Sequence, residues 1–385
     1  MKPRTDNVPS YYARYFADFA PGRPYLSLIL SIVEGSLAIS GRVFWKNCWL
    51  IVEHTAACDE TIVTWPRGSP PQVSPIDCER VARVASAFGE QAIRALRSSS
   101  AAVIGAGGTG SAAIEILARA GVGRLILVDP DVIDRSNLER VHGSTPADAQ
   151  NETSKVLVAA KLIRSIDPSI VIEPWIGRLP QKQIVDAVVR ADVMLGCTDQ
   201  QHSRLALSDL ALRYLIPSID CGVIMEGGGG HVSGQIAQFV RFLPADPCAL
   251  CRDMIVPNRI KQELMSEEEK NQRRRAADEA RERGDDPNPY WHNQAQINTV
   301  GYLTTAVGAM IAGYAIGWLT KRFSPPFERL QINFVAKYFD VTDLAQRHRP
   351  GCACTRFRGW ASQANADALI SAPEHWPLPQ RAVLV

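Results

Sequence analysis

The chain has 385 residues and a formal net charge of +2, with 46% hydrophobic and 21% charged residues. This length is sufficient for one large domain with an added piece, and the composition is that of a soluble globular protein. The nearly balanced charge argues against nucleic acid as the main partner, since nucleic-acid binding depends on a strong positive field.

The N-terminal sequence, MKPRTDNVPSYYARYF, lacks the charged start, apolar core and small-residue cleavage site of an export signal. It therefore predicts a cytoplasmic protein, in which the nine cysteines are reduced thiols or metal ligands. Residues 1–79 are interpreted as an N-terminal extension. Residues 25–33 and 43–52 predict strands, and 67–75 form a proline-rich connector. The extension carries no chemical motif, so it is expected to dock a substrate or partner, or simply to extend the fold.

From residue 80 the chain alternates short apolar runs with helical stretches. Strands are predicted at residues 101–104, 124–128, 171–176, 192–195 and 218–221, and helices at 109–120, 155–166, 185–190 and 203–214. This alternation predicts an α/β fold with a Rossmann-like, doubly wound, mostly parallel sheet.

Three later stretches are less regular. Residues 300–319 are apolar enough to suggest a membrane span, but their four glycines and the lack of a second span favour a buried helix at a core or dimer seam. We therefore expect no membrane partner. Residues 252–286 carry both charge signs at helical spacing and predict a solvated helix, with a mobile flap as the alternative. Residues 330–341 show a late strand pattern.

A glycine motif lies between the first predicted strand and helix of this region. Its residues are Gly105, Gly107, Gly108 and Gly110 in the sequence GAGGTG. Glycines allow a tight turn and a close approach to phosphates, and the following helix N-terminus attracts anions. Asp129 ends the next strand, where a carboxylate can accept hydrogen bonds from ribose hydroxyls. Both features fit NAD as well as ATP.

Further polar residues distinguish an ATP site from an NAD site. Arg140 and Lys155 follow Asp129, and Asp199 and Arg204 follow a later strand. A carboxylate that attacks a triphosphate is repelled by it, so the reaction needs cations at the phosphates and a carboxylate that holds Mg²⁺. A dehydrogenase has no use for this set, and ATP chemistry is therefore favoured.

These motifs resemble a known family. GAGGTGS, LVDPDVIDRSNLER, Lys155 and GCTDQQHSR are similar to the ThiF/MoeB/HesA adenylyltransferases, the bacterial relatives of ubiquitin-activating enzymes, over about residues 80–355. The resemblance implies an adenylation domain at residues 80–360 and a C-terminal tail at 361–385. It also implies cofactor roles for the glycine turn, with Asp129 on the ATP ribose.

The resemblance assigns the remaining roles residue by residue. Asn137, Arg140 and Lys155 would contact the phosphates, and Asp199 would coordinate magnesium. The family places an arginine before the first strand, reaching into the partner subunit's site. Arg83 matches it best, with Arg80 as the alternative, which implies a homodimer.

Four cysteines resemble the family's zinc site: Cys248, Cys251, Cys352 and Cys354. Two cysteine pairs can complete one tetrahedral metal site, and the alternatives are four buried cysteines or a redox pair. The second pair is Cys-x-Cys where many relatives have Cys-x-x-Cys. Family members that form a thioester carry a cysteine after the first pair, whereas residues 252–351 contain none. We therefore predict adenylation without a covalent enzyme intermediate.

The expected reaction is ATP-dependent adenylation of a C-terminal carboxylate with release of pyrophosphate. Its substrate would be a ubiquitin-like or sulfur-carrier protein, or the precursor peptide of a natural-product pathway. The glycines at 227–230 would form either a groove for an extended substrate or a hairpin turn. Two rival classes remain: an NAD-dependent oxidoreductase and a non-catalytic adaptor that keeps the fold.

Overall fold

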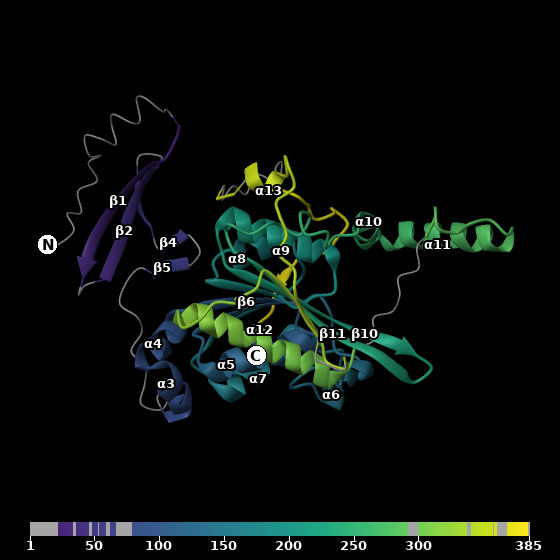
Figure 1. The fold of residues 1–385 in the computed structure, drawn as a ribbon, viewed down its shortest axis with the longest axis horizontal. Coiled ribbons are helices and arrows are strands. Elements are labelled where there is room, and N and C mark those ends of the chain that lie inside the picture. The colour runs from purple at the N-terminus through teal and green to yellow at the C-terminus, as the bar shows by residue number, and fades with distance from the viewer. Residues whose placement is uncertain are drawn as a thin grey trace. The chain divides into compact units, whose positions relative to one another are not determined.

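The protein is described from a computed structural model. The described residues are 22–33, 36–45, 48–52, 54–58, 62–66, 79–291, 299–336, 340–356, 358–359 and 368–383. The chain divides into two compact units, Met1–Pro70 and Pro71–Val385 (Figure 1). The predicted proline-rich connector lies outside the described residues, and the predicted boundary at residue 79 stays a prediction.

The first unit is all β among its described residues. Its antiparallel three-stranded sheet has the order β1 (Tyr25–Val33), β2 (Ser36–Trp45) and β3 (Cys48–Ile51). A separate hairpin joins β4 (His54–Cys58) and β5 (Ile62–Pro66). The prediction of one strand over residues 43–52 is wrong, because Trp45 pairs with Cys48 and the chain reverses between them. No glycine or proline marks this reversal in the sequence, only the polar pair Lys46–Asn47.

The second unit is built on a nine-stranded sheet with the order β13-β12-β11-β10-β9-β6-β7-β8-β14. The strands are β6 (Ser100–Ile104), β7 (Arg124–Val128), β8 (Val171–Ile176), β9 (Val193–Gly196), β10 (Ser218–Gly228), β11 (His231–Phe242), β12 (Arg329–Asn333), β13 (Asp340–Asp343) and β14 (Gln380–Arg381). Strands β10, β9, β6, β7 and β8 pair in parallel. The strands flanking them pair antiparallel. This confirms the α/β class with a parallel core.

The structure changes the bounds of two predicted strands. The predicted strand at 330–341 is two antiparallel strands, β12 and β13. The strand predicted at 218–221 continues to Gly228 and pairs with β11 in a long hairpin, which extends beyond the sheet in Figure 1. The glycines at 227–230 lie at its tip, where Gly229 and Gly230 have φ of 60° and 84°. Such positive φ values suit a tight hairpin turn.

Helices cover both faces of the sheet. They are α3 (Ala82–Phe88), α4 (Glu90–Ser98), α5 (Gly108–Ala120), the 3-10 helix η1 (Arg135–Asn137), α6 (Pro146–Gln150), α7 (Lys155–Ile166), α8 (Lys182–Val188), α9 (Gln201–Tyr214), α10 (Pro257–Leu264), α11 (Glu267–Glu282), α12 (Gly301–Thr320) and α13 (Ala353–Arg356). One buried core contains α5, α7 and α12, and the other contains α8 and α9. Figure 1 shows these two groups on opposite sides of the sheet.

Helix α12 corresponds to the apolar segment predicted as a buried helix. Among the described residues it is the one helix long and apolar enough to cross a membrane, and 61% of its most apolar window is buried within the protein. A Cβ atom at Gly308 would lie 2.4 Å from the Thr109 carbonyl oxygen. Glycine at this position therefore lets α12 pack directly against α5, as expected of a core helix.

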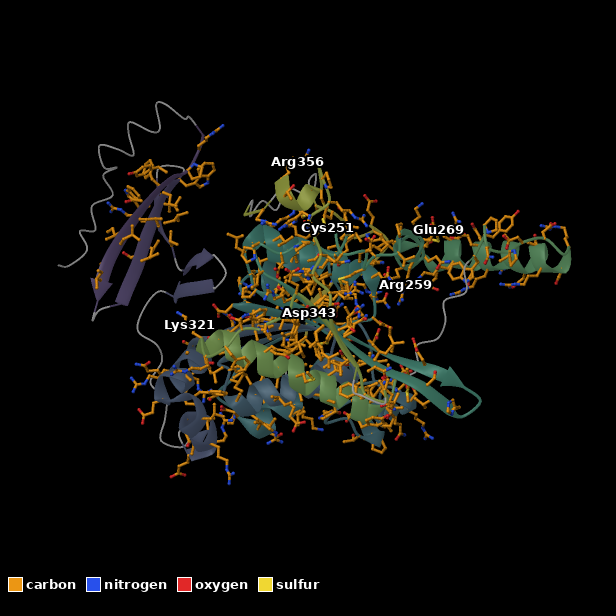
Figure 2. All side chains as sticks on the ribbon, in the orientation of Figure 1. Cys251, Arg259, Glu269, Lys321, Asp343 and Arg356 are labelled. Carbon is orange, nitrogen blue, oxygen red and sulfur yellow. The ribbon has the colours of Figure 1, made fainter. Side chains whose placement is uncertain are left out.

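Helices α10 and α11 form the charged segment. Ser266 and Glu269 cap α11 reciprocally: each side chain accepts a hydrogen bond from the other's backbone N–H. Figure 2 shows Arg259 on α10, beside the body of the second unit, and Glu269 on α11, which leads away from that body. The predicted solvated helix is confirmed, since most of α11 is exposed. The flap role stays a prediction.

Candidate active site

A cavity of about 490 Å³ lies at the carboxyl ends of the parallel strands. Ligands of open α/β sheets bind at this edge. Seven of the predicted site residues line the cavity: Gly105, Gly107, Gly108, Asp129, Arg140, Lys155 and Asp199. The structure thus brings together residues that are up to 94 positions apart, Gly105 to Asp199, along the chain.

The glycine turn between β6 and α5 is shaped by close backbone contacts. Gly105 has φ of +97°, and a Cβ atom there would lie 2.4 Å from the Cys197 carbonyl oxygen. A Cβ atom at Gly110 would lie 1.8 Å from the Gly105 carbonyl oxygen. Gly110 therefore shapes the turn without lining the cavity. Gly107 has no atom within 4 Å of its Cβ position, so its backbone is open to a ligand.

Asp129 follows β7 and is buried beside the turn. Its Oδ2 accepts the backbone N–H of Ala106 at 2.7 Å, and its Oδ1 accepts that of Asp131 at 2.8 Å. Burial raises the pKa of Asp129 to about 6, and the positive charge of Lys155 counteracts part of this rise. The two hydrogen bonds therefore fix the orientation of the carboxylate. Its protonation can be followed by measurements around pH 6.

We expect nucleotide affinity to fall as the pH drops through about 6, because protonation removes an acceptor that the ribose hydroxyls would use. Because the pKa of Asp129 is raised from 3.8 to about 6 in the folded state, the folded protein binds this proton more tightly than the unfolded chain. The contribution of Asp129 to the free energy of unfolding therefore rises as the pH falls and is complete below pH 3.8. Protonation of Asp129 therefore does not itself destabilise the fold at pH 5.5.

The measurement is the ATP dissociation constant between about pH 5 and 8. Asp129→Asn should weaken binding and flatten the profile. Asp209→Asn is the control, because burial also raises the pKa of Asp209, and neither Asp209 nor its ion-pair partner Arg213 lines the cavity. A profile that stays flat in the unmodified protein would contradict the role of Asp129.

Two of the predicted cations, Lys155 and Arg140, line the cavity. Lys155, at the start of α7, places Nζ 2.9 Å from Asp131 Oδ2. Burial opposes the charge on Lys155, but the carboxylates of Asp129 and Asp131 outweigh it and raise the Lys155 pKa. Arg140 donates from Nη1 to the Ser136 carbonyl oxygen at 2.7 Å. The raised pKa keeps Lys155 charged at neutral pH, and both side chains can face phosphate oxygens.

Asn137 occupies a different position from the one its predicted role suggests. It is buried, and its Oδ1 accepts the backbone N–H of Asp134 at 3.3 Å within the cap of η1. It does not line the cavity. In this structure Asn137 supports the segment that carries Arg140, and its phosphate contact stays a prediction.

Asp199 follows β9 and is exposed at the cavity. Its backbone carbonyl accepts a hydrogen bond from Arg259 Nη2 at 2.9 Å. Arg259 also lines the cavity and pairs with Glu263 at 3.1 Å. The Glu263 carboxylate in turn accepts the backbone N–H groups of Gln201 and His202 at the start of α9. Helix α10 thus closes this side of the site.

Sequence reasoning missed Arg259 and also Arg178, which follows β8 and lines the cavity. Arg178 could have been predicted as a site residue, because residues just after a parallel strand lie at this edge of the sheet. Arg259 does not follow a predicted strand, and α10 reaches the site only through the tertiary fold.

The thiols Cys197 and Cys221 also line the cavity. A hydrogen bond with Cys197 and burial raise the pKa of the Cys221 thiol. Cys221 Sγ also donates to the Gly196 carbonyl oxygen at 3.3 Å. A thiol held in its neutral form is a poor nucleophile, so Cys221 is better suited to packing than to attack.

The two candidate arginines near the first strand differ in their surroundings. Arg80 pairs with Asp167 at 2.7 Å and donates to the Arg119 carbonyl oxygen at 2.9 Å, so it is used within its own chain. Arg83, on α3, is exposed and does not line the cavity of its own chain. It is therefore available to a second subunit, and its role there stays a prediction.

The four predicted zinc ligands converge. All four sulfur atoms of Cys248, Cys251, Cys352 and Cys354 lie within 4.8 Å of one another. Two of the distances, from Cys248 to Cys352 and from Cys251 to Cys354, are 3.7 Å. Tetrahedral Zn²⁺ with Zn–S bonds of about 2.3 Å requires sulfur separations of about 3.8 Å. The Cys-x-Cys spacing therefore does not prevent a zinc geometry.

The fold and the site identify the family. The family model of the ThiF family matches residues 80–354, and the chain belongs to this family. The SAMP-activating enzyme E1 of Haloferax volcanii is 35% identical over 158 residues, which cover 40% of this chain and 54% of that protein. The molybdopterin-synthase adenylyltransferase of Escherichia coli is 32% identical over 157 residues, or 41% and 59% of the two chains. The chain thus spans little more than half of these relatives.

A solved structure shares the fold. E. coli MccB with ATP has a TM-score of 0.54 and 18% sequence identity, covering 71% of this chain and 74% of that chain. At this identity the similarity shows the fold alone. The same enzyme has been solved in complex with N-formylated MccA, with a TM-score of 0.53 and 16% identity, covering 71% of this chain and 74% of that chain.

Proposed function

We propose that the protein uses ATP to adenylate the C-terminal carboxylate of a ubiquitin-like or sulfur-carrier protein, or of a precursor peptide. The observation that carries the proposal is the convergence of Arg140, Lys155 and Asp199 on one cavity with the glycine turn and Asp129. An oxidoreductase would share the turn and Asp129 but has no need of the other three residues.

The site acts mainly by positioning and charge neutralisation. The glycine turn and the N-terminus of α5 bind the phosphates, and Asp129 orients the ribose. Arg140 and Lys155 reduce the repulsion between the triphosphate and the incoming carboxylate. That carboxylate forms a bond to the α-phosphorus while the bond to the pyrophosphate oxygen breaks. The products are an acyl-adenylate and pyrophosphate.

Two metals complete the proposal. Asp199 would hold Mg²⁺, which neutralises phosphate charge when it is bound. Its exposed carboxylate at the cavity rim fits an oxygen ligand with room for water. The four-cysteine cluster would hold Zn²⁺ as a structural ion, because it is closed by four protein ligands and lies apart from the residues that line the cavity.

The acyl-adenylate is passed to an external nucleophile, without a thioester on this enzyme. This rests on the absence of cysteine from residues 252–351 and on the neutral state that burial favours for Cys221. The first unit would dock the substrate or partner. Its β1 strand exposes aliphatic side chains, with Leu30 at 66% and Ile32 at 78% exposure. We place the reaction in the cytoplasm.

The direct experiment is ATP–pyrophosphate exchange with purified protein and candidate carboxylate substrates. Incorporation of labelled pyrophosphate into ATP that depends on a free substrate C-terminus supports the proposal. The oxidoreductase alternative predicts nicotinamide binding without exchange, and the adaptor alternative predicts nucleotide binding without turnover. A small protein ending in Gly-Gly and a short peptide, supplied separately, distinguish the two substrate classes.

The proposed homodimer makes a separate prediction, in which Arg83 completes the partner's site. Arg83→Ala and Lys155→Ala should each lose exchange activity when alone. After the two variants are mixed and subunits exchange, one site in each mixed dimer regains both residues. About one quarter of all sites should then recover, because half of the dimers are mixed. Arg94→Ala, which changes another exposed arginine, is the control. Mixtures without recovery would contradict the shared site.

A further inference from the structure

The C-terminal segment 368–383 packs against one wall of the cavity, although the family match ends at residue 354. Strand β14 pairs antiparallel with β8, and the Ala382 backbone N–H donates to the Pro174 carbonyl oxygen at 2.9 Å. The Gln181 side chain donates from Nε2 to the Pro377 carbonyl oxygen at 2.7 Å. The segment therefore fixes the loop that follows β8.

Trp376 lies behind two residues that line the cavity. The Arg178 Cζ atom lies 5.2 Å from the Trp376 ring centroid, and the His202 ring centroid lies 5.1 Å from it. Arg178 and His202 line the cavity, whereas Trp376 does not. Arg178 is also held through its backbone N–H, which donates to Gln181 Oε1 at 2.8 Å.

The order of the strands shows which part of a nucleotide would reach Arg178. Strands β6, β7 and β8 are neighbours in the sheet. The glycine turn follows β6, Asp129 follows β7, and Arg178 follows β8. With phosphates at the first position and ribose at the second, the base extends to the third. Arg178 thus lies at the base end of the cavity.

The guanidinium group of Arg178 is suited to contact an aromatic ring. A guanidinium group is planar and stacks on aromatic faces. Trp376 occupies one side of Arg178, and the cavity lies on another. Among the described residues, the ion pairs near this loop join Lys182 to Asp186 and Arg190 to Glu173, and none involves Arg178. Its charge is therefore free for a ligand.

We propose that Arg178 contacts the nucleotide base and that Trp376, from the C-terminal segment, is the positioning residue that holds Arg178 for this contact. The proposal rests on the proposed function for the identity of the nucleotide. It assigns to residues 368–383 a part in the nucleotide site that the family-matched region alone does not supply.

The experiment uses full-length protein and two readouts. Calorimetry gives the dissociation constants of AMP and of inorganic tripolyphosphate, and ATP–pyrophosphate exchange gives KM and kcat. Trp376→Ala and Arg178→Ala should each raise the AMP dissociation constant and the ATP KM by about 5- to 20-fold, the range of one cation–π contact. The tripolyphosphate dissociation constant and kcat should change by less than about twofold.

Matched variants separate positioning from general packing. Trp376→Phe keeps an aromatic face and should restore most of the AMP affinity. Trp291→Ala removes another tryptophan with an arginine over it, Arg274 at 4.8 Å, but Trp291 does not line the cavity. It should leave the AMP dissociation constant unchanged. If Trp376→Ala fails to fold, Arg178→Ala and Trp376→Phe decide the question.

The outcomes separate this inference from the proposed function. Unchanged AMP affinity in Arg178→Ala overturns the inference even if exchange is active, and so does a loss of tripolyphosphate affinity instead of AMP affinity. Equal losses in Trp376→Ala and Trp376→Phe, with none in Arg178→Ala, indicate packing alone and also overturn it. A protein that binds AMP as described but never exchanges pyrophosphate contradicts the proposed function and leaves the inference supported.

Discussion

Replacing Asp199 by alanine is expected to lower ATP–pyrophosphate exchange by at least about 100-fold, the effect of removing one group that stabilises charge in a transition state. The Asp199 carboxylate is exposed just after β9, and within the described part of the chain its side chain takes part in one hydrogen bond, a 3.4 Å contact from Gln200. The fold does not depend on it. Far-ultraviolet circular dichroism and the melting temperature should therefore match those of the unmodified protein.

Magnesium titration makes this test sharper. If Asp199 binds the ion, any residual activity of Asp199→Ala should need a higher magnesium concentration, while ATP binding without the metal is preserved. Asp278→Ala is the control, because Asp278 is an exposed carboxylate on α11 that does not line the cavity. Exchange at the normal rate in Asp199→Ala would refute the metal role and weaken the proposed mechanism as a whole.

The second large effect is expected at the four-cysteine cluster. Purified protein should contain about one zinc ion per chain by atomic emission spectroscopy, since four thiolates complete one tetrahedral site. Cys352→Ser should release most of the zinc and lower the free energy of unfolding by about 3 kcal/mol, or the melting temperature by about 6–12 °C. The loss is structural because metal binding contributes directly to folding.

Cys48→Ser is the matched control for the cysteine substitution. Cys48 is exposed in the first unit and lies outside the cluster. It should keep the zinc content and the melting temperature unchanged. A protein with no zinc and a Cys352→Ser variant of full stability would show that the cluster is only a set of packed thiols.

The local parts of the candidate site could be predicted from the sequence. Gly105 and Asp129 lie directly after strands, so their positions follow from the strand pattern alone. The convergence of Cys248 with Cys352 could be expected only from the family resemblance, because nothing local relates residues 104 positions apart. For Asn137 the family resemblance predicts a phosphate contact, whereas its burial in the cap of η1 depends on how that turn closes.

The residues that sequence reasoning missed have a common physical cause. Arg259 reaches the cavity because α10 packs at the start of α9, and Trp376 reaches Arg178 because the C-terminal strand pairs with β8. Such long-range pairings leave no periodic signal. The split of residues 43–52 into β2 and β3 has a different cause, since an apolar run hides a reversal that lacks glycine and proline.

The four-cysteine cluster has a consequence for protein engineering. Its two halves close a loop that contains α10, α11 and α12, and Cys248 and Cys352 are 104 residues apart in it. The entropy of closing a loop grows only slowly with its length. Gly284 is an exposed residue just beyond α11. A reporter domain inserted after it would therefore lengthen a loop whose two ends are already held together by the cysteine cluster. Such a fusion offers a fluorescent label on the protein and leaves both chain ends in place.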